Sequence, residues 1–180
     1  MATRKQSSRT STASEQRAER SPLALAASIA GRATLLGVHF SRGMFEFISP
    51  DESGSVAGEI GTRVEHSLAD SALRSTVNIV IEVPCPDPER GQRIRISAAI
   101  ELSYNLSGDA PPNAKEAECF AKINGVYNAW PYWREFVQHC TTRMGLPPLT
   151  LPLMTAARAL AHAGFRESGP DPSADDKSGG

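Results

Sequence analysis

The sequence predicts an α+β fold: a four-stranded antiparallel sheet with a long helix and a C-terminal helix packed on one side. Two observations predict it. Apolar residues alternate with polar ones in four segments of the 180-residue chain, which is typical of strands with one wet face. After residue 112 the apolar spacing changes to three and four, which is typical of helices. Strands followed by helices in this way favour an α+β arrangement.

A short helix and a first strand open the predicted domain. Ser21-Pro22 is a typical helix start, because the hydroxyl caps free N–H groups and proline lacks one, so we expect a helix over about 22–31. Apolar residues then alternate with small or polar ones, which predicts a strand over about 34–41. Glycine and proline interrupt residues 42–58, so we expect a long loop there. An apolar cluster lies inside that loop, formed by Met44, Phe45, Phe47 and Ile48.

Three further strands follow in close succession. Ile60, Thr62, Val64, His66 and Leu68 alternate with more polar or small residues in the first segment. Apolar residues take every second position from Val77 to Val83 and from Ile94 to Leu106. Because their connections are short, these strands are expected to form an antiparallel meander.

A capped helix is expected after the sheet. Asn113 and Glu116 have the spacing of a capping box, in which each side chain binds the backbone N–H of the other residue. Phe120 and Ile123 give this helix an apolar side. Asn124-Gly125 is expected to end it.

A longer helix is predicted to begin at Pro131, because a first helical position needs no N–H. Its apolar residues recur at steps of three, four and seven as far as Met144, and Gly145 suits the residue after a helix end. Pro147-Pro148 then forces the chain to run extended. An Ala-rich stretch predicts a last helix over 154–163.

Both ends of the chain are expected to be disordered tails. Residues 1–20 and 165–180 are poor in large apolar residues, so they cannot bury enough surface to offset the entropy lost on ordering. One domain is therefore expected over residues 21–164.

The region 128–152 resembles a known family. It begins Asn-Ala-Trp-Pro-Tyr-Trp-Arg-Glu and, after an amphipathic helix, ends with Leu-Pro-Pro-Leu-Thr-Leu-Pro. This pattern is similar to the C-terminal half of the SecB family of export chaperones, and its last part is closest in form to SecB-like chaperones of actinobacterial type. The resemblance extends, at the level of the pattern alone, over about residues 30–165. It implies a dimer of dimers in which sheets of neighbouring subunits sandwich the long helices.

The resemblance implies a holdase that binds unfolded polypeptides, such as preproteins for export, and keeps them from aggregating. The alternative is a SecB-like chaperone dedicated to one antitoxin of a toxin–antitoxin system. SecB proteins that feed the SecA motor carry acidic residues in the first strand and its flank, whereas residues 34–41 contain none, so delivery to SecA is doubtful. A small-ligand or enzymatic α+β domain is a third hypothesis.

Client binding requires exposed apolar surface that adapts to many partners, which methionine and aromatic side chains supply. The apolar cluster in the predicted loop and the chain after the double proline are expected to form the two walls of one groove, because the resemblance places the loop beside the final helix. The predicted groove residues are Met44, Phe45, Phe47, Ile48, Leu149, Leu151, Leu153, Met154, Ala157 and Leu160.

The long helix carries more apolar surface than one small sheet is expected to cover. We therefore predict a homo-oligomer, most simply a tetramer. The predicted interface residues are Trp130, Tyr132, Trp133, Phe136, Val137 and Cys140.

The sequence contains no nucleotide-binding, hydrolase or zinc-protease motif, and its four histidines are scattered, so no catalysis, cofactor or metal is expected. A net charge of −1 gives no reason to expect a nucleic-acid partner. No run of 18 apolar residues occurs, so no membrane span is expected. Three cysteines without a CxxC spacing favour a reducing, cytoplasmic setting.

Overall fold

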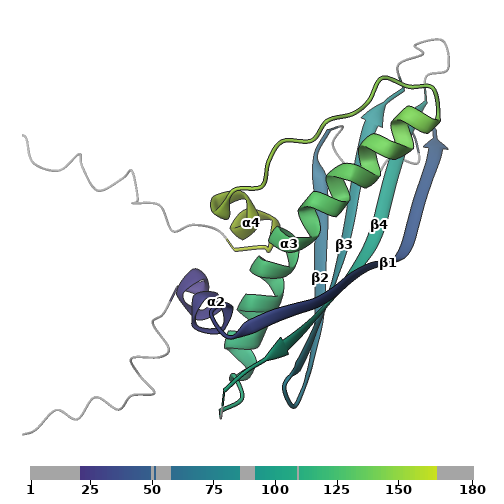
Figure 1. Ribbon diagram of the computed structural model, residues 1–180. Coiled ribbons are helices and arrows are strands. Elements are labelled where there is room, and N and C mark those ends of the chain that lie inside the picture. Colours follow the sequence, from purple (N-terminus) through teal and green to yellow (C-terminus); the bar gives the residue numbers. More distant parts are fainter. Residues whose placement is uncertain (1–20, 50, 52–57, 86–91, 109, 166–180) are drawn as a thin grey trace, which may run out of the picture.

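A single antiparallel sheet forms the centre of the fold, seen here in a computed structural model that describes residues 21–49, 51, 58–85, 92–108 and 110–165. The elements are α2 (Pro22–Ala30), β1 (Ala33–Ile48), β2 (Ile60–Ala69), β3 (Ala72–Pro84), β4 (Arg93–Leu106), α3 (Ala114–Arg143) and α4 (Ala156–His162). The strand order is β1-β4-β3-β2, with the helices on one side of the sheet (Figure 1). The predicted fold class is confirmed.

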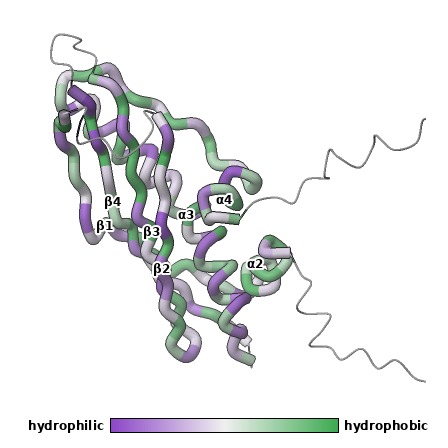
Figure 2. The backbone as a smooth tube through the Cα atoms, turned by 180° about the vertical axis from the view of Figure 1, so that it is seen from behind, coloured by the Kyte–Doolittle hydropathy of each residue, from purple (hydrophilic) through white to green (hydrophobic). Residues whose placement is uncertain are grey.

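The predicted meander is formed by β2, β3 and β4, whereas β1 crosses over to pair with β4. Hydrophilic and hydrophobic positions alternate along the strands in Figure 2. We call the face that α3 covers the inner face and the opposite one the outer face. The even positions of β4, from Ile94 to Leu106, are buried on the inner face.

The first strand is longer than the sequence predicted. A strand was expected over 34–41 and a loop over 42–58, but β1 runs from Ala33 to Ile48. The predicted loop is therefore wrong for residues 42–48, which pair with β4 along their whole length. Of the tail expected at 165–180, Phe165 packs against the core, which corrects its assignment to the tail. Residues 1–20, 166–180 and loop residues 50 and 52–57 lie outside the described residues.

Gly43 explains why the sequence predicted a loop where the structure has a strand. It pairs with Ala98 of β4, and a Cβ added at Gly43 would collide with the ring of Phe136. This glycine provides space for an aromatic side chain of α3 and does not end the strand.

One continuous helix of 30 residues, α3, replaces the two that the sequence predicted. The capping box is confirmed, because Asn113 Oδ1 accepts from the Glu116 N–H at 2.8 Å and Glu116 Oε2 accepts from the Asn113 N–H at 3.1 Å. Pro131 lies inside the helix and does not start it. Interior proline costs about 3 kcal/mol of helix stability. Here burial of the neighbouring Trp130 and Trp133 against the rest of the chain offsets that cost.

Gly125 does not end a helix, because it is the point where α3 approaches β3. A Cβ on this residue would collide with Ser75 Oγ and contact the Val77 side chain. The hydroxyl of Ser75 donates to the Ala121 carbonyl at 2.9 Å, one turn earlier in α3. A glycine in the middle of the helix therefore permits close packing on the sheet.

Gly125→Ala is expected to lower the free energy of unfolding by about 1–3 kcal/mol, because the added methyl overpacks the contact with Ser75. Alanine is the better helix former, so a purely local effect would instead stabilise the chain by up to about 1 kcal/mol. Urea unfolding of the variant shows whether the free energy of unfolding falls or rises. In the double variant Ser75→Gly with Gly125→Ala, the clash is removed and the lost stability should be restored.

Candidate functional site: an apolar strip beside the edge strand

The inner face of β1 is only partly covered by helix. Helix α3 packs on β2, β3 and β4, and it reaches β1 through Phe136. Because they pair with buried residues of β4, alternate side chains of β1 also point to the inner face. We call the following six residues the apolar strip: Leu35, Val38, Phe40, Phe45 and Phe47 of β1, with Phe136 of α3.

Aromatic rings form two contacting pairs within the apolar strip. The Phe136 ring lies 5.1 Å from the Phe40 ring and 6.0 Å from the buried Trp133 ring, measured between centroids. Phe45 and Phe47 meet edge to face at 5.8 Å. Phe40 and Phe47 stay 39% and 38% exposed, which is unusual for phenylalanines beside a core.

The predicted client groove is only partly reproduced around the apolar cluster. Phe45 and Phe47 lie on the inner face, in the apolar strip. Met44 pairs with Ser97 and therefore points to the outer face, while Ile48 is buried. Their placement in a strand, with a period of two, separates residues that a loop could have gathered.

The second predicted wall of the groove leads to the other edge of the sheet. We call residues 146–154 the return segment; it leads from the end of α3 back to α4, which contacts β2 (Figure 1). Leu151 and Leu160 are buried, whereas Leu153 is 71% exposed and Ala157 is also exposed. Within one chain, α4 with Ala157 and Leu160 therefore lies at the opposite edge of the sheet from Phe45 and Phe47.

Hydrogen bonds to the backbone hold the return segment along α3. The donors and acceptors on α3 lie within three turns of the helix and bind main-chain groups, so they fix the path of the segment whatever its side chains are. The bonds are Leu149 N–H to Thr141 Oγ1 (3.1 Å), Arg134 Nε to the Leu151 carbonyl (2.8 Å) and Trp130 Nε1 to the Pro152 carbonyl (2.8 Å).

The predicted oligomer interface needs a correction. Trp130, Trp133 and Val137 are buried within the chain, at 2%, 0% and 0% exposure, so they are not the surplus apolar surface that the sequence suggested. They pack into the core with the sheet, α4 and the return segment. Tyr132, which is 43% exposed, and the half-buried Cys140 lie one turn either side of Phe136 and remain candidates for the interface.

The C-terminal helix α4 contacts α3 and β2 through His162. Its ring lies 5.4 Å from the Trp130 ring, and its carbonyl accepts a hydrogen bond from the Thr62 hydroxyl of β2. Burial, and secondly the charge of Arg158, lower the pKa of His162 below its ordinary value. The histidine is therefore neutral when α4 is docked at neutral pH.

We expect acid to weaken the docking of α4. In the unfolded chain His162 has its ordinary pKa of about 6.5, so around that pH the unfolded state binds more protons than the folded state. The contribution of neutral His162 to stability is complete above this pKa and is lost as the pH falls towards the lower folded pKa. His162→Gln should reduce the loss of stability between pH 7 and about pH 5, measured by urea unfolding; an unchanged slope would assign the effect to other groups.

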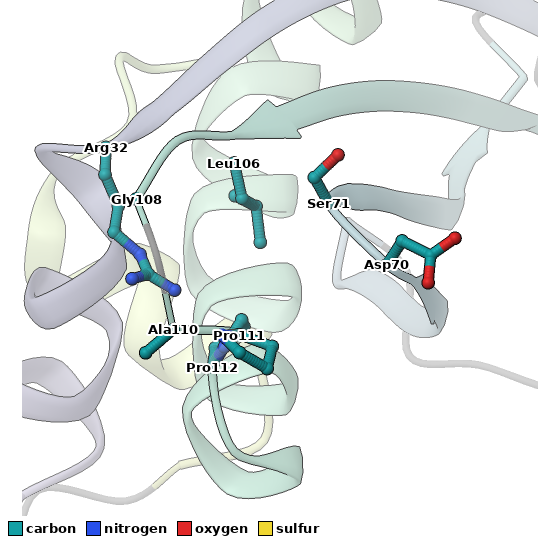
Figure 3. A pocket seen from close by; sticks show the side chains of 8 residues that line it. All are labelled: Arg32, Asp70, Ser71, Leu106, Gly108, Ala110, Pro111 and Pro112. Atoms are coloured by element: carbon teal, nitrogen blue, oxygen red, sulfur yellow. The ribbon is translucent and has the colours of Figure 1, made fainter.

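A hollow of about 270 Å³ lies at the end of the sheet near the β2–β3 turn. Figure 3 shows Arg32 and Asp70 on opposite sides of it, with Pro111 and Pro112 between them. The sequence did not predict this hollow, because its lining comes from segments that only the fold brings together. Its two charges are of opposite sign, and its lining contains no set of metal ligands.

The described residues contain no group of three histidine, cysteine or acidic side chains that could hold a metal ion. Burial raises the pKa of the Cys119 and Cys140 thiols, which keeps them protonated and weakly nucleophilic at neutral pH. In the part of the chain that the structure describes, no helix is both long and apolar enough to cross a membrane.

Comparison with known proteins gives two related matches, although no family model matches the chain. A stretch of 55 residues is 36% identical to SecB-like chaperone Rv1957 of Mycobacterium tuberculosis strain H37Rv and to SecB-like chaperone MT2006 of strain CDC 1551. The match covers 30% of this chain and 30% of each relative, so it spans less than a third of those proteins.

The fold is similar to that of Mycobacterium tuberculosis Rv1957, a SecB-like chaperone solved in complex with a ChAD peptide from the Rv1956 HigA1 antitoxin. The TM-score is 0.60 at 18% sequence identity, over 73% of this chain and 96% of that chain. One stretch of this chain is thus similar in sequence to SecB-like chaperones, and its fold is similar to that of one of them. The resemblance seen in the sequence is thereby confirmed.

Proposed function

We propose that the chain is a chaperone that binds unfolded polypeptide through the apolar strip and keeps it from aggregating. The observation that carries this proposal is the half-exposed row of phenylalanines on the inner face of β1, beside Phe136. Exposed apolar patches of this kind on a small domain are typical of sites that bind another chain. The similarity to SecB-like chaperones supports the same function.

The geometry suits a client without a fixed shape. Aromatic rings provide a large apolar contact area with few rotatable bonds, so they accept many apolar side chains at a low entropic cost. β1 is an edge strand, because β4 is its neighbour on one side only. An extended client can therefore bind its apolar side chains to the strip while its backbone aligns with the free edge of β1.

An aggregation assay tests the proposed activity. The purified full-length chain is expected to suppress aggregation of a chemically unfolded protein at stoichiometric amounts, without nucleotide, because binding alone removes the client from self-association. Light scattering of the client after dilution from denaturant measures this. A chain that leaves the scattering unchanged at several-fold excess is not a holdase.

A dedicated antitoxin chaperone is the second candidate, favoured by the likeness to a fold solved with an antitoxin peptide. The two candidates differ in the range of clients. A holdase for export preproteins protects several unrelated unfolded proteins, whereas a dedicated chaperone protects one partner. A toxin gene next to the gene for this chain favours the dedicated role.

We also propose a homo-oligomer, in its simplest form a tetramer, in a cytoplasmic setting. Tyr132 and Cys140 are the predicted interface residues that remain at least partly exposed for assembly. Delivery to SecA stays doubtful. The longer β1 does contain one acidic residue, Glu46, but its carboxylate is bound by Arg95 at 3.0 Å. Sedimentation at micromolar concentration tests the assembly, and a monomer there would contradict it.

A further inference from the structure

A row of residues crosses all four strands on the outer face of the sheet. The pairing register places Arg42 of β1, Ala99 of β4, Asn78 of β3 and Arg63 of β2 side by side in that order. Residues paired in this way point to the same face of a sheet. One arginine therefore stands near each edge of the outer face, with a small residue and an amide between them. We call these four residues the arginine row.

The arginine row borders a shallow hollow of about 340 Å³, and both arginines line it. The Cα atoms of Arg42 and Arg63 are three strand spacings apart, or roughly 14 Å, so long side chains from the two edges face the same space. The adjoining row is made of Met44, Ser97, Val80 and Gly61, and the last three of these residues also line the hollow.

Both arginines are available to a partner. Neither Arg42 nor Arg63 forms a hydrogen bond or an ion pair with any residue that the structure describes, and both are exposed. Two free guanidinium groups facing one hollow repel each other and attract a negative group placed between them.

The neighbouring rows limit what that negative group can be. Glu65 and Glu101 lie in the next row on one side. On the other side, one row beyond Met44 and Ser97, Glu46 and Glu82 lie in a row with Arg95 between them. A nucleic acid, with a charge at every nucleotide, would meet these carboxylates as well as the arginines. A single carboxylate side chain fits between them. The ion pairs in these rows join His39 with Glu101 (3.2 Å) and Arg95 with Glu82 (2.9 Å) and Glu46 (3.0 Å).

We propose that the arginine row is a docking site for an acidic polypeptide segment, which places an Asp or Glu carboxylate in the hollow between Arg42 and Arg63. Each guanidinium offers a planar fork of N–H donors that matches a carboxylate, and the Asn78 amide adds a further donor. This surface lies on the face opposite the apolar strip, so an acidic partner and an unfolded client can bind at the same time. The site goes beyond the proposed chaperone activity and does not depend on it.

Fluorescence anisotropy with the full-length chain tests the site. The probe is a labelled peptide with Glu residues in a Gly/Ser frame, and its counterpart carries Gln in place of Glu. The Glu peptide is expected to bind and the Gln peptide not, and binding should weaken with added salt because exposed charges are screened. Arg42→Gln and Arg63→Gln should each weaken binding about three-fold, and the double variant about ten-fold.

Arg74→Gln is the matched control, because Arg74 is exposed on the same face but pairs with Ser103 and Ser67, outside the arginine row. It should bind the Glu peptide like the wild type, as should Phe47→Asp, which separates this site from the apolar strip. The proposal is wrong if the Glu peptide does not bind, if the Gln peptide binds equally well, or if Arg74→Gln weakens binding as much as Arg42→Gln. Binding of a single-stranded oligonucleotide in preference to the Glu peptide would also overturn it.

Discussion

Trp133→Ala is expected to lower the free energy of unfolding by about 3–5 kcal/mol, a large part of the stability of a domain this size. Trp133 is fully buried between α3 and the sheet, and it stacks on Phe136 of the apolar strip. Alanine would leave a cavity that the sheet cannot close, because β3 and β4 are fixed by their ladder. Urea unfolding followed by tryptophan fluorescence and circular dichroism measures the change.

The neighbouring Tyr132 provides the control for this experiment. It is 43% exposed, so Tyr132→Ala should change the stability by less than about 1 kcal/mol. The sequence placed both aromatic residues in an oligomer interface, whereas the structure separates them. If Trp133→Ala keeps its stability and instead yields smaller oligomers, Trp133 is an interface residue and its burial within one chain is wrong.

Phe47→Asp is expected to weaken client binding about ten-fold or more, since burying a phenylalanine is worth roughly 1.5–3 kcal/mol and an aspartate in the strip adds a desolvation cost. Phe47 is preferred to Phe45, because Phe45 also packs against the core. The measurement is anisotropy of a labelled, permanently unfolded polypeptide titrated with the chaperone.

Met44→Asp is the matched control for that substitution. Met44 lies three residues earlier in the same strand and is similarly exposed, at 43% against 38% for Phe47, but it points to the outer face. It should leave client affinity unchanged within about two-fold. Equal losses in the two variants would show that the effect is on the strand as a whole and that the inner face has no special role.

The fold class was predictable because strands with one wet face alternate with a period of two, and β2, β3 and β4 show this plainly. The lengths of β1 and α3 were not predictable for one common reason. In a sequence, Gly43 and Gly125 predict the end of a strand or helix. In the structure each provides room for a close contact with a distant residue: Gly43 with Phe136, and Gly125 with Ser75. Only the packing distinguishes these roles.

The candidate site was predictable in part. The concentration of apolar residues at 44–48 drew attention to Phe45 and Phe47, which the structure places on the inner face of β1. Because that stretch was assigned to a loop, the prediction missed that Met44 points to the outer face. It also placed the apolar cluster and the return segment in one groove. The arginine row left no signal in the sequence, because its members come from four strands and meet only through the register.

Photo-crosslinking tests most directly whether clients bind the apolar strip. A photoreactive phenylalanine analogue is placed at Phe47 in one preparation and at Leu153, the most exposed apolar residue of the return segment, in another. Each is irradiated with a bound unfolded client. Crosslinks from position 47 and few from position 153 are the predicted result. Crosslinks mainly from position 153 would contradict the strip and move client binding to the opposite edge of the sheet.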